Sequence, residues 1–243
     1  MEQKIKAIFT DLGDTFRIIR KDEAYSNRAK ARIAELLGVT GDPVAFFSEV
    51  IEPRYDIYRE WALKFYCEAP EKVLWTRWLA YDFPRERVEK AAAELTYEYR
   101  KSKGERVVVD GGIETVKELC RRGYVLGIIS DLVGVNEVDE WLDQDGLRPY
   151  FKTVQQSSIT LIRKPHPAIY YYALDEAGVT ATESCFVGDN LNRDIIGAKA
   201  AGFGMTIGVQ YPGKKPAVIT DENRPDQIIT YFSQLLDLFP PLE

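Results

Sequence analysis

Short apolar runs that end in polar residues alternate with helical patterns along this chain, and this alternation narrows its possible folds more than any other feature. Three such runs lead directly into a hydroxyl or carboxylate side chain: the run ending at Phe9 before Thr10 and Asp11, Tyr124 to Ile129 before Ser130, and Cys185 to Val187 before Gly188 and Asp189. A short apolar run followed by polar residues is typical of a buried strand. Strands that alternate with helices indicate an α/β fold, a parallel sheet with helices on both of its faces.

After the first strand, the chain carries helical patterns up to about residue 103 without a convincing strand. Asp42 and Pro43 form a helix-start signal, because Asp caps the first turn and Pro fits the first helical position. Gly38 is expected to end the preceding helix, and Pro53 to break or kink the following one. Four helical segments are predicted, at 24–37, 44–62, 71–81 and 84–95, packed as a bundle. The predicted domains are an α/β core of residues 1–19 and 105–243 and a helical cap of residues 20–104.

The remaining segments complete the predicted core. Phe16 to Arg20 is expected to be a short connection, Ala217 to Thr220 a last edge strand, and Pro225 to Phe239 a closing helix. Further strands are expected at 154–158 and 205–209, and further helices at 113–122, 136–143, 165–177 and 195–201.

The composition excludes several classes of protein. The chain has 243 residues, 45% hydrophobic and 29% charged, which is an ordinary soluble globular composition. Its net charge of −6 comes without a basic stripe, and it has no apolar run of membrane length, so neither nucleic acid nor a membrane is an expected partner. Its three cysteines (Cys67, Cys120 and Cys185) are scattered, which argues against a disulfide framework or zinc site. The charged start, Met1 to Lys4, does not resemble a signal peptide, so a cytoplasmic location is expected. The sequence carries no signature of an oligomeric state.

The carboxyl ends of neighbouring parallel strands meet at one edge of a sheet, where ligands bind. Asp11, Ser130 and Asp189 are therefore expected to lie together, and Lys164, where a helix begins, is placed to reach the same edge. Carboxylates hold Mg²⁺ through hard oxygen ligands. Lysine and serine can hold the oxygens of a phosphoryl group while one aspartate attacks it.

With these residues in order, the chain resembles the haloacid dehalogenase-like (HAD) hydrolase superfamily, as a phosphatase-type member with a helical-bundle cap inserted after the first strand. The resemblance implies a Rossmann-like α/β core and covers nearly the whole chain. Four motifs carry it: Asp11-Leu12-Gly13-Asp14-Thr15, Ser130 after Ile128-Ile129, Lys164 within Arg163-Lys164-Pro165-His166-Pro167, and the acidic Gly188-Asp189-Asn190-Leu191-Asn192-Arg193-Asp194.

The resemblance implies a catalytic role for Asp11 and Lys164 and a phosphate-binding role for Ser130, Asp131 and Lys164. Asp11 would be the nucleophile that forms an aspartyl-phosphate from a small phosphorylated molecule. Ser130 and Lys164 would hold the transferring group and neutralise its developing charge. The backbone N–H of Asp131 is a further expected donor to its oxygens.

The resemblance also implies a Mg²⁺ site. Asp11, Asp189 and the backbone carbonyl of Gly13 would be ligands, with Asp194 as a further ligand or a support for the others.

Gly13 departs from the family pattern, because family phosphatases usually carry there an aspartate that protonates the leaving alkoxide and then activates water. Loss of general acid–base help costs about 10²- to 10⁴-fold in rate. The enzyme could prefer good leaving groups, Asp14 or a cap residue could supply the acid, or activity could be weak. Two further hypotheses stay open: a catalytically silent binding or regulatory protein, and a metal-independent dehalogenase, against which Asp189 and Asp194 argue.

Several other residues have a structural interpretation and a functional one. The sole histidine, His166, is expected to cap or orient its loop rather than to catalyse. Cap aromatics are expected in the bundle core rather than against substrate, and cap arginines on solvated faces unless they meet an anionic substrate tail; these are Trp61, Trp75, Trp78, Arg54, Arg59 and Arg77.

Overall fold

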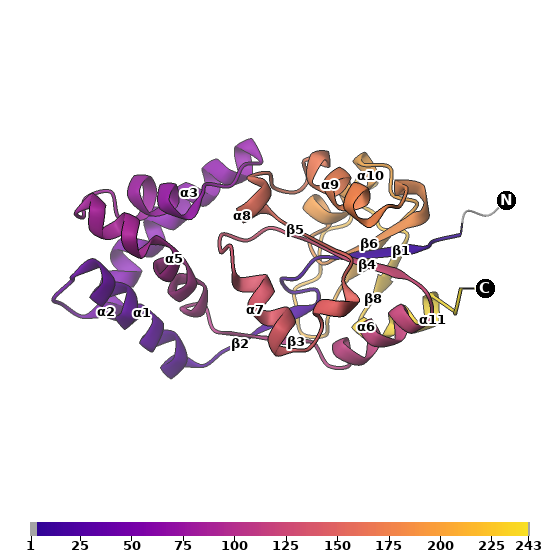
Figure 1. Cartoon of the computed structure of the whole chain (residues 1–243), viewed down its shortest axis with the longest axis horizontal. Coiled ribbons are helices and arrows are strands. Elements are labelled where there is room, and N and C mark those ends of the chain that lie inside the picture. Colours follow the sequence, from indigo (N-terminus) through magenta and orange to yellow (C-terminus); the bar gives the residue numbers. More distant parts are fainter. Residues whose placement is uncertain (1–3, 243) are drawn as a thin grey trace.

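A six-stranded parallel sheet forms one half of the molecule, and a group of helices forms the other (Figure 1). The computed structural model describes residues 4–242. The charged first three residues and residue 243, which the predicted core includes, lie outside the described residues.

The sheet confirms the predicted α/β class. Its strand order is β5-β4-β1-β6-β7-β8, and every neighbouring pair is parallel. The strands are β1 (Ala7–Thr10), β4 (Val125–Ser130), β5 (Thr153–Gln156), β6 (Ser184–Gly188), β7 (Met205–Val209) and β8 (Gln227–Ile229). Because β1 lies between β4 and β6, the three strands that end in candidate site residues are neighbours.

Side chains alternate between the two faces of the sheet, as in any strand. Ile8 packs into the core on one side, whereas Ala7 and Phe9 pack into a separate core with Ile169 of α9 on the other. Figure 1 shows α9 and α10 on one face of the sheet and α6 and α11 on the opposite face. These helices and the other helices of the core are α6 (Gly112–Arg121), α7 (Glu137–Gln144), α8 (Ser157–Thr160), α9 (Pro167–Ala177), α10 (Ile196–Ala200) and α11 (Leu235–Leu238).

The helical part, at the left of Figure 1, has its own hydrophobic core around Trp75, Tyr58 and Phe47. It consists of α1 (Glu23–Leu37), α2 (Pro43–Phe46), α3 (Glu52–Phe65), the short α4 (Glu71–Val73) and α5 (Arg85–Lys101), with π-helical segments at Phe47–Ile51 and Leu74–Leu79. The start signal at Asp42 is confirmed, since its carboxylate accepts the N–H of Val44 at 2.8 Å. Pro53 does not break the helix. The helical path runs on through the preceding π-helical turn, and Pro53 is the second residue of α3, directly after this change in hydrogen-bonding pattern.

A two-stranded antiparallel ribbon joins the two parts. It pairs β2 (Arg17–Arg20) with β3 (Glu105–Val108). The predicted short connection at Phe16 to Arg20 is therefore wrong in its later part. Residues 17–20 form a strand because they pair with β3. This partner lies more than eighty positions later, so no local sequence pattern reveals the pairing.

Two predictions near the carboxyl terminus are also wrong. Residues 217–220 form no strand, and Val218 there is 80% exposed. The last strand is instead β8, inside the predicted closing helix, of which Leu235–Leu238 is helical. β8 is held by its alternating pattern, with Ile229 buried and Ile228 half exposed, and by Asp226, whose carboxylate accepts the N–H of Thr206 at 2.7 Å.

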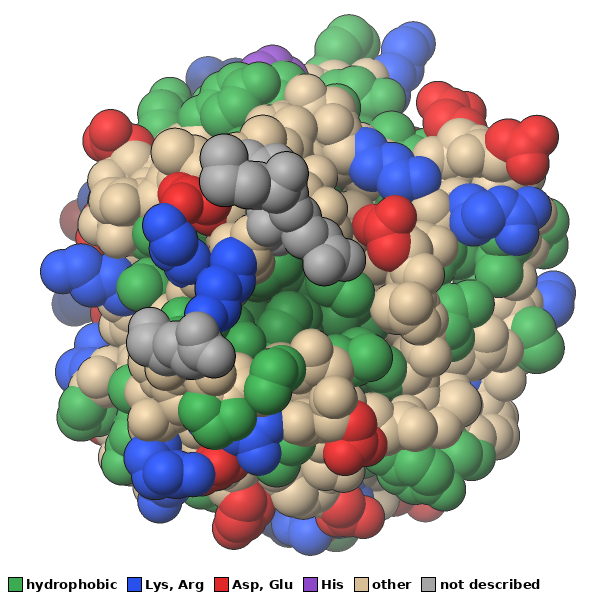
Figure 2. Space-filling view, turned by 90° about the vertical axis from the view of Figure 1, so that its right-hand side faces the viewer, with side chains coloured by type: hydrophobic (Ala, Val, Ile, Leu, Met, Phe, Trp, Pro, Cys, Tyr) green, Lys and Arg blue, Asp and Glu red, His purple; other side chains and the backbone are tan. Residues whose placement is uncertain are grey.

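Figure 2 shows the end of the core that faces away from the helical part. Positive and negative side chains are mixed over this face, and hydrophobic side chains line a depression between them. Every helix within residues 4–242 is too short or too polar to cross a membrane.

Candidate active site

Three of the predicted side chains meet at one oxygen atom. Ser130 Oγ donates to Asp11 Oδ1 at 2.9 Å, and Lys164 Nζ donates to the same oxygen at 2.8 Å. Ser130 ends β4 and Asp11 follows β1, so the parallel pairing of these strands brings them together. The second oxygen, Asp11 Oδ2, accepts no hydrogen bond from residues 4–242. One oxygen of Asp11 is thus anchored and the other is available.

Lys164 is the most deeply buried cation of the site, with 1% of the residue exposed. Its ammonium group also lies 2.7 Å from Asp194 Oδ1. Burial alone would lower the pKa of Lys164, but the charges of Asp11 and Asp194 outweigh it, so the pKa lies above its ordinary value. Lys164 therefore keeps its positive charge between the two carboxylates.

Different hydrogen bonds position the two carboxylates of the acidic fourth motif. Asp189 follows β6, and its backbone N–H donates to Thr15 Oγ1 at 3.0 Å. Asp194 lies in a π-helical turn, Leu191–Ile195, and accepts the N–H of Asn190 at 3.0 Å. Gly188 permits this fold-back, because a Cβ atom at its position would lie 2.4 Å from the Asp194 carboxylate.

The donor set suits a divalent cation. Asp11, Asp189 and Asp194 each offer a carboxylate oxygen, and these oxygens lie within 4.8 Å of one another. Burial, together with the charges of Asp11 and Asp194, raises the pKa of Asp189 to about 7. Burial also raises the pKa of Asp194, although Lys164 opposes it. A hard cation would relieve this concentration of negative charge, so the residues present fit Mg²⁺.

Gly13 follows Asp11 by two residues in the same loop. It forms an isolated bridge with Arg17 that uses the N–H of Arg17, donated to Leu12, and the N–H of Asp14, donated to Arg17. The Gly13 carbonyl takes part in neither bond. Its φ lies outside the left-handed region, and a Cβ atom there would meet nothing within 4 Å. The fold therefore does not require glycine at the position where the family resemblance predicts an acid.

The two remaining acids of the neighbourhood are engaged elsewhere. Asp14 pairs with Lys214 at 2.9 Å, and both side chains are about half exposed. The Asp131 carboxylate accepts the backbone N–H of Lys164 at 3.0 Å and lies 3.5 Å from Arg193. The Asp131 carboxylate thus fixes the loop that carries Lys164. The sequence prediction concerned only the backbone N–H of Asp131 and did not include this contact.

A cavity of about 180 Å³ opens beside the site. Gly13, Ser130 and Asp131 are among the residues that line it, and Arg100 is the lining residue that comes from residues 20–104. No cap carboxylate of the described chain lines it, which leaves a cap-supplied acid without support.

The residues with two interpretations follow the structural one. His166 Nδ1 accepts the N–H of Ala168 at 3.2 Å and so caps α9. Trp75 is buried and donates to Thr96, while Trp61 and Trp78 pack against the same cap core. Arg59 and Arg77 are exposed, as expected, whereas Arg54 is largely buried, where it pairs with Asp82 at 2.6 Å and donates to the Leu79 carbonyl.

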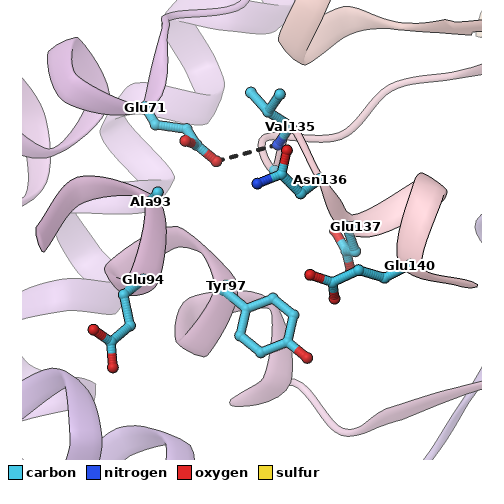
Figure 3. A pocket seen from close by; sticks show the side chains of 9 residues that line it. Glu71, Ala93, Glu94, Tyr97, Val135, Asn136, Glu137 and Glu140 are labelled. Atoms are coloured by element: carbon cyan, nitrogen blue, oxygen red, sulfur yellow. Dashed lines mark hydrogen bonds between the residues drawn. The ribbon is translucent and has the colours of Figure 1, made fainter.

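A second cavity, of about 190 Å³, contains none of the predicted site residues (Figure 3). It lies between α5 and the start of α7, and its walls are acidic, with Glu94, Glu137 and Glu140 among them. Glu71 accepts the N–H of Val135 across it at 3.1 Å, which ties the helical part to the core.

Sequence reasoning missed a buried network that connects the helical part to the lysine loop. Glu68 accepts hydrogen bonds from Tyr58, from Ser157 and from Arg163, the neighbour of Lys164. Glu68 and Arg163 are both almost fully buried. A charged pair of this kind looks like two surface residues in the sequence, so no local signal could reveal it.

The parallel sheet with carboxylates, a hydroxyl and a buried lysine at its carboxyl edge defines an α/β protein with a candidate ligand site at that edge. A sequence model described as haloacid dehalogenase-like hydrolase matches residues 5–202, so the chain belongs to this family, as the motifs predicted.

Curated relatives match over part of their length. The glyceraldehyde 3-phosphate phosphatase of Pyrococcus furiosus is 32% identical over 130 residues, which cover 54% of this chain and 53% of the relative. The phosphoglycolate phosphatase of Yersinia pestis is 34% identical over 125 residues, covering 50% of this chain and 51% of the relative. The chain thus spans about half the length of the curated relatives it matches.

Solved structures match over nearly their whole length and support the fold. A HAD phosphatase from Thermococcus onnurineus has a TM-score of 0.61 at 22% identity and covers 98% of this chain and 100% of that one. A 2-haloacid dehalogenase from Pseudomonas syringae pv. Tomato DC3000 has a TM-score of 0.68 at 24% identity, covering 96% and 97%.

Proposed function

We propose that this chain is a Mg²⁺-dependent phosphatase of a small phosphorylated metabolite, with Asp11 as the nucleophile. The observation that carries this proposal is the environment of Asp11. Ser130 and Lys164 both donate to Oδ1, which leaves Oδ2 without a hydrogen bond and available for attack.

In the proposed reaction, Asp11 Oδ2 attacks phosphorus and the bond from phosphorus to the leaving oxygen breaks, giving an aspartyl-phosphate and an alkoxide that takes its proton from solvent water. Water then attacks the phosphorus of this intermediate, releases inorganic phosphate and restores the Asp11 carboxylate. Lys164 and Ser130 stabilise the negative charge on the phosphoryl oxygens, since both groups lie within hydrogen-bonding distance of the nucleophile. The Asp131 N–H is the proposed third donor.

Asp11, Asp189, Asp194 and the Gly13 carbonyl are the proposed ligands of Mg²⁺. When bound, the ion would neutralise the charge of the phosphoryl group beside the nucleophile. We also propose that residues 20–104 form a cap domain over the core of residues 1–19 and 105–243.

Gly13 limits the proposed substrates. Without an acid at this position, the leaving alkoxide departs unprotonated, so esters of acidic alcohols should react fastest. The two named relatives act, by their names, on phosphoglycolate and glyceraldehyde 3-phosphate, which supports a small phosphate ester as the substrate class.

The test is phosphate release from an aryl phosphate and from a panel of metabolite phosphates, with and without Mg²⁺. We expect Mg²⁺-dependent hydrolysis that the Asp11→Asn variant loses. Asp175→Asn, at an exposed position of α9, is the matched control. Equal hydrolysis by wild type and Asp11→Asn would overturn the proposal.

A second candidate function is favoured by Gly13 itself, since the backbone there does not require glycine and the acid is nevertheless missing. In this proposal the site binds Mg²⁺ and phosphate without turnover, as a binding or regulatory protein. Binding of both by calorimetry, with no hydrolysis of aryl phosphate, would support it over the phosphatase; measurable turnover would exclude it.

A further inference from the structure

Three arginines line the cavity that opens beside Gly13 and Ser130. They come from three segments: Arg17 begins β2, Arg106 lies in β3, and Arg100 lies in the last turn of α5. The pairing of β2 with β3 brings Arg17 and Arg106 together, although they are far apart in sequence.

Arg17 is held rigidly beside the active-site loop. Its Nη1 donates to Asp145, its Nη2 donates to the Arg106 carbonyl at 2.7 Å, and its guanidinium lies 4.4 Å from the ring centroid of Trp141. Its side chain is 6% exposed, and its Nε is buried without a partner in the described chain.

Arg100 and Arg106 share one carboxylate. Arg100 Nε donates to Glu137 at 2.7 Å, whereas the nearest nitrogen of Arg106 lies 3.9 Å from the same side chain. Arg106 Nη1 donates to the Arg100 carbonyl at 2.7 Å. Within residues 4–242, the other guanidinium nitrogens of Arg100 and Arg106 make no hydrogen bond. Two cations thus have one anion between them, and several donors remain unused.

The electrostatics agree with this geometry. Burial and the neighbouring charge of Arg100 lower the pKa of Arg106 to about 10, because Glu137 compensates it incompletely. A ligand anion in the cavity would supply the missing charge.

The cavity also limits the size of a ligand. Its volume of about 180 Å³ corresponds to roughly six water molecules, so it suits a compact molecule of a few carbons. Ser130 and Asp131 line it together with Arg100 and Arg106, and these two arginines also line a neighbouring cavity that Ser130 and Asp131 do not line. A ligand whose phosphate lies at Ser130 and Asp131 would therefore have its other groups within reach of the arginines.

We propose that Arg100 and Arg106 form a subsite for a carboxylate at the far end of the substrate, and that the substrate class is small phosphorylated carboxylic acids. This inference rests on the proposed phosphatase function for the position of the phosphate. The planar guanidinium presents paired N–H donors that match a carboxylate, which makes arginine suited to this role. Arg17 is a positioning residue, since its donors hold the Arg106 backbone and Asp145.

The experiment measures binding of two ligands of equal carbon number, 3-phosphoglycerate and glycerol 3-phosphate, by calorimetry in the presence of Mg²⁺. They differ in a carboxylate that replaces a hydroxymethyl group. Binding is measured in the Asp11→Asn background, so the result does not depend on turnover. Absent hydrolysis in the wild-type assay would count against the proposed function alone, and this ratio of affinities tests the subsite alone.

We expect the acid to bind roughly 10- to 100-fold more tightly than the alcohol, as is typical of a hydrogen bond to a charged group. Arg106→Gln should reduce this preference to about threefold or less, and Arg106→Lys should retain part of it because the charge remains. Arg85→Gln, at an exposed arginine that pairs with Glu89, should keep the full preference.

Equal affinities for the two ligands in the Asp11→Asn protein would overturn the inference without any further variant. A preference that survives Arg106→Gln in a protein with unchanged thermal unfolding would also overturn it. If Arg106→Gln does not fold, the Arg106→Lys ratio decides, and an unchanged ratio there counts against the subsite.

Discussion

Replacing Gly13 by aspartate should convert this protein into a much faster hydrolase of alkyl phosphates. The substitution is compatible with the fold, because the φ of Gly13 lies outside the left-handed region and its Cβ would meet no atom within 4 Å. The cavity of about 180 Å³ beside it has room for the side chain, and Arg17 and Arg106 in its walls offset the added negative charge. The variant should therefore fold with stability close to that of the wild type.

The size of the gain follows from what the side chain would supply. A positioned general acid is worth about 10²- to 10⁴-fold, or roughly 3 to 5 kcal/mol of activation free energy. This full gain is expected for glycerol 3-phosphate, whose alkoxide needs a proton to leave. For an aryl phosphate, whose leaving group is stable as an anion, the gain should stay below about tenfold.

The assay is initial-rate phosphate release from both substrates at saturating Mg²⁺ for wild type, Gly13→Asp and Gly13→Asn. The asparagine variant has nearly the same shape and no acidic proton, so it should behave like wild type. A folded Gly13→Asp protein that gains nothing on the alkyl ester would refute the reasoning, as would an equal gain from Gly13→Asn.

Three further outcomes are expected. Lys164→Met should lower kcat about 10²- to 10³-fold on aryl phosphate. It should also lower the unfolding free energy by about 3 kcal/mol in urea titrations, because two buried carboxylates lose their cation. Unchanged values of both quantities would contradict the role assigned to Lys164. Mg²⁺ at about a hundred times its Kd should raise Tm by roughly 5–10 °C, and Asp189→Asn should remove most of this rise; a similar rise in the variant would place the ion elsewhere. Burial raises the pKa of Glu71 more than its hydrogen bond from the Val135 N–H lowers it. Glu71 therefore binds its proton more tightly in the native state than in the unfolded state, and the unfolding free energy falls as pH increases from about 4.3 through the raised pKa. The variant Glu71→Gln should therefore gain in unfolding free energy relative to wild type as the pH rises above about 4.3. A pH-independent difference would show that this pKa is not raised.

The candidate active site was largely predictable because its residues sit at strand ends. Asp11, Ser130 and Asp189 each follow an apolar run, and parallel strands place such ends at one edge. Pairing of β1 with β4 and β6 then brings them together without further information. The prediction of Lys164 depended also on the motif Arg163-Lys164-Pro165-His166-Pro167, because Lys164 does not follow a strand that would place it at this edge.

The secondary-structure predictions were wrong where a segment is too short for its hydrophobic periodicity to distinguish a strand from a helix. Gln227–Ile229 has three residues and becomes a strand because β7 offers it an edge. Arg17–Arg20 becomes a strand because β3 returns beside it. In both cases the hydrogen-bonding partner comes from elsewhere in the chain, and local propensity is overridden by it.

The alternation of apolar runs and helical patterns predicted the parallel sheet, and the four motifs predicted the family and the carboxylate–lysine set. The tertiary structure alone decided which arginines face the cavity. Arg17, Arg100 and Arg106 line it, whereas Arg54, Arg59 and Arg77 do not. The difference lies in burial and in the carboxylates that each one meets, and these depend on contacts between distant segments. At Gly13, the sequence shows only that the expected acid is missing. The structure adds that a side chain would have room there, because a Cβ atom would meet nothing within 4 Å.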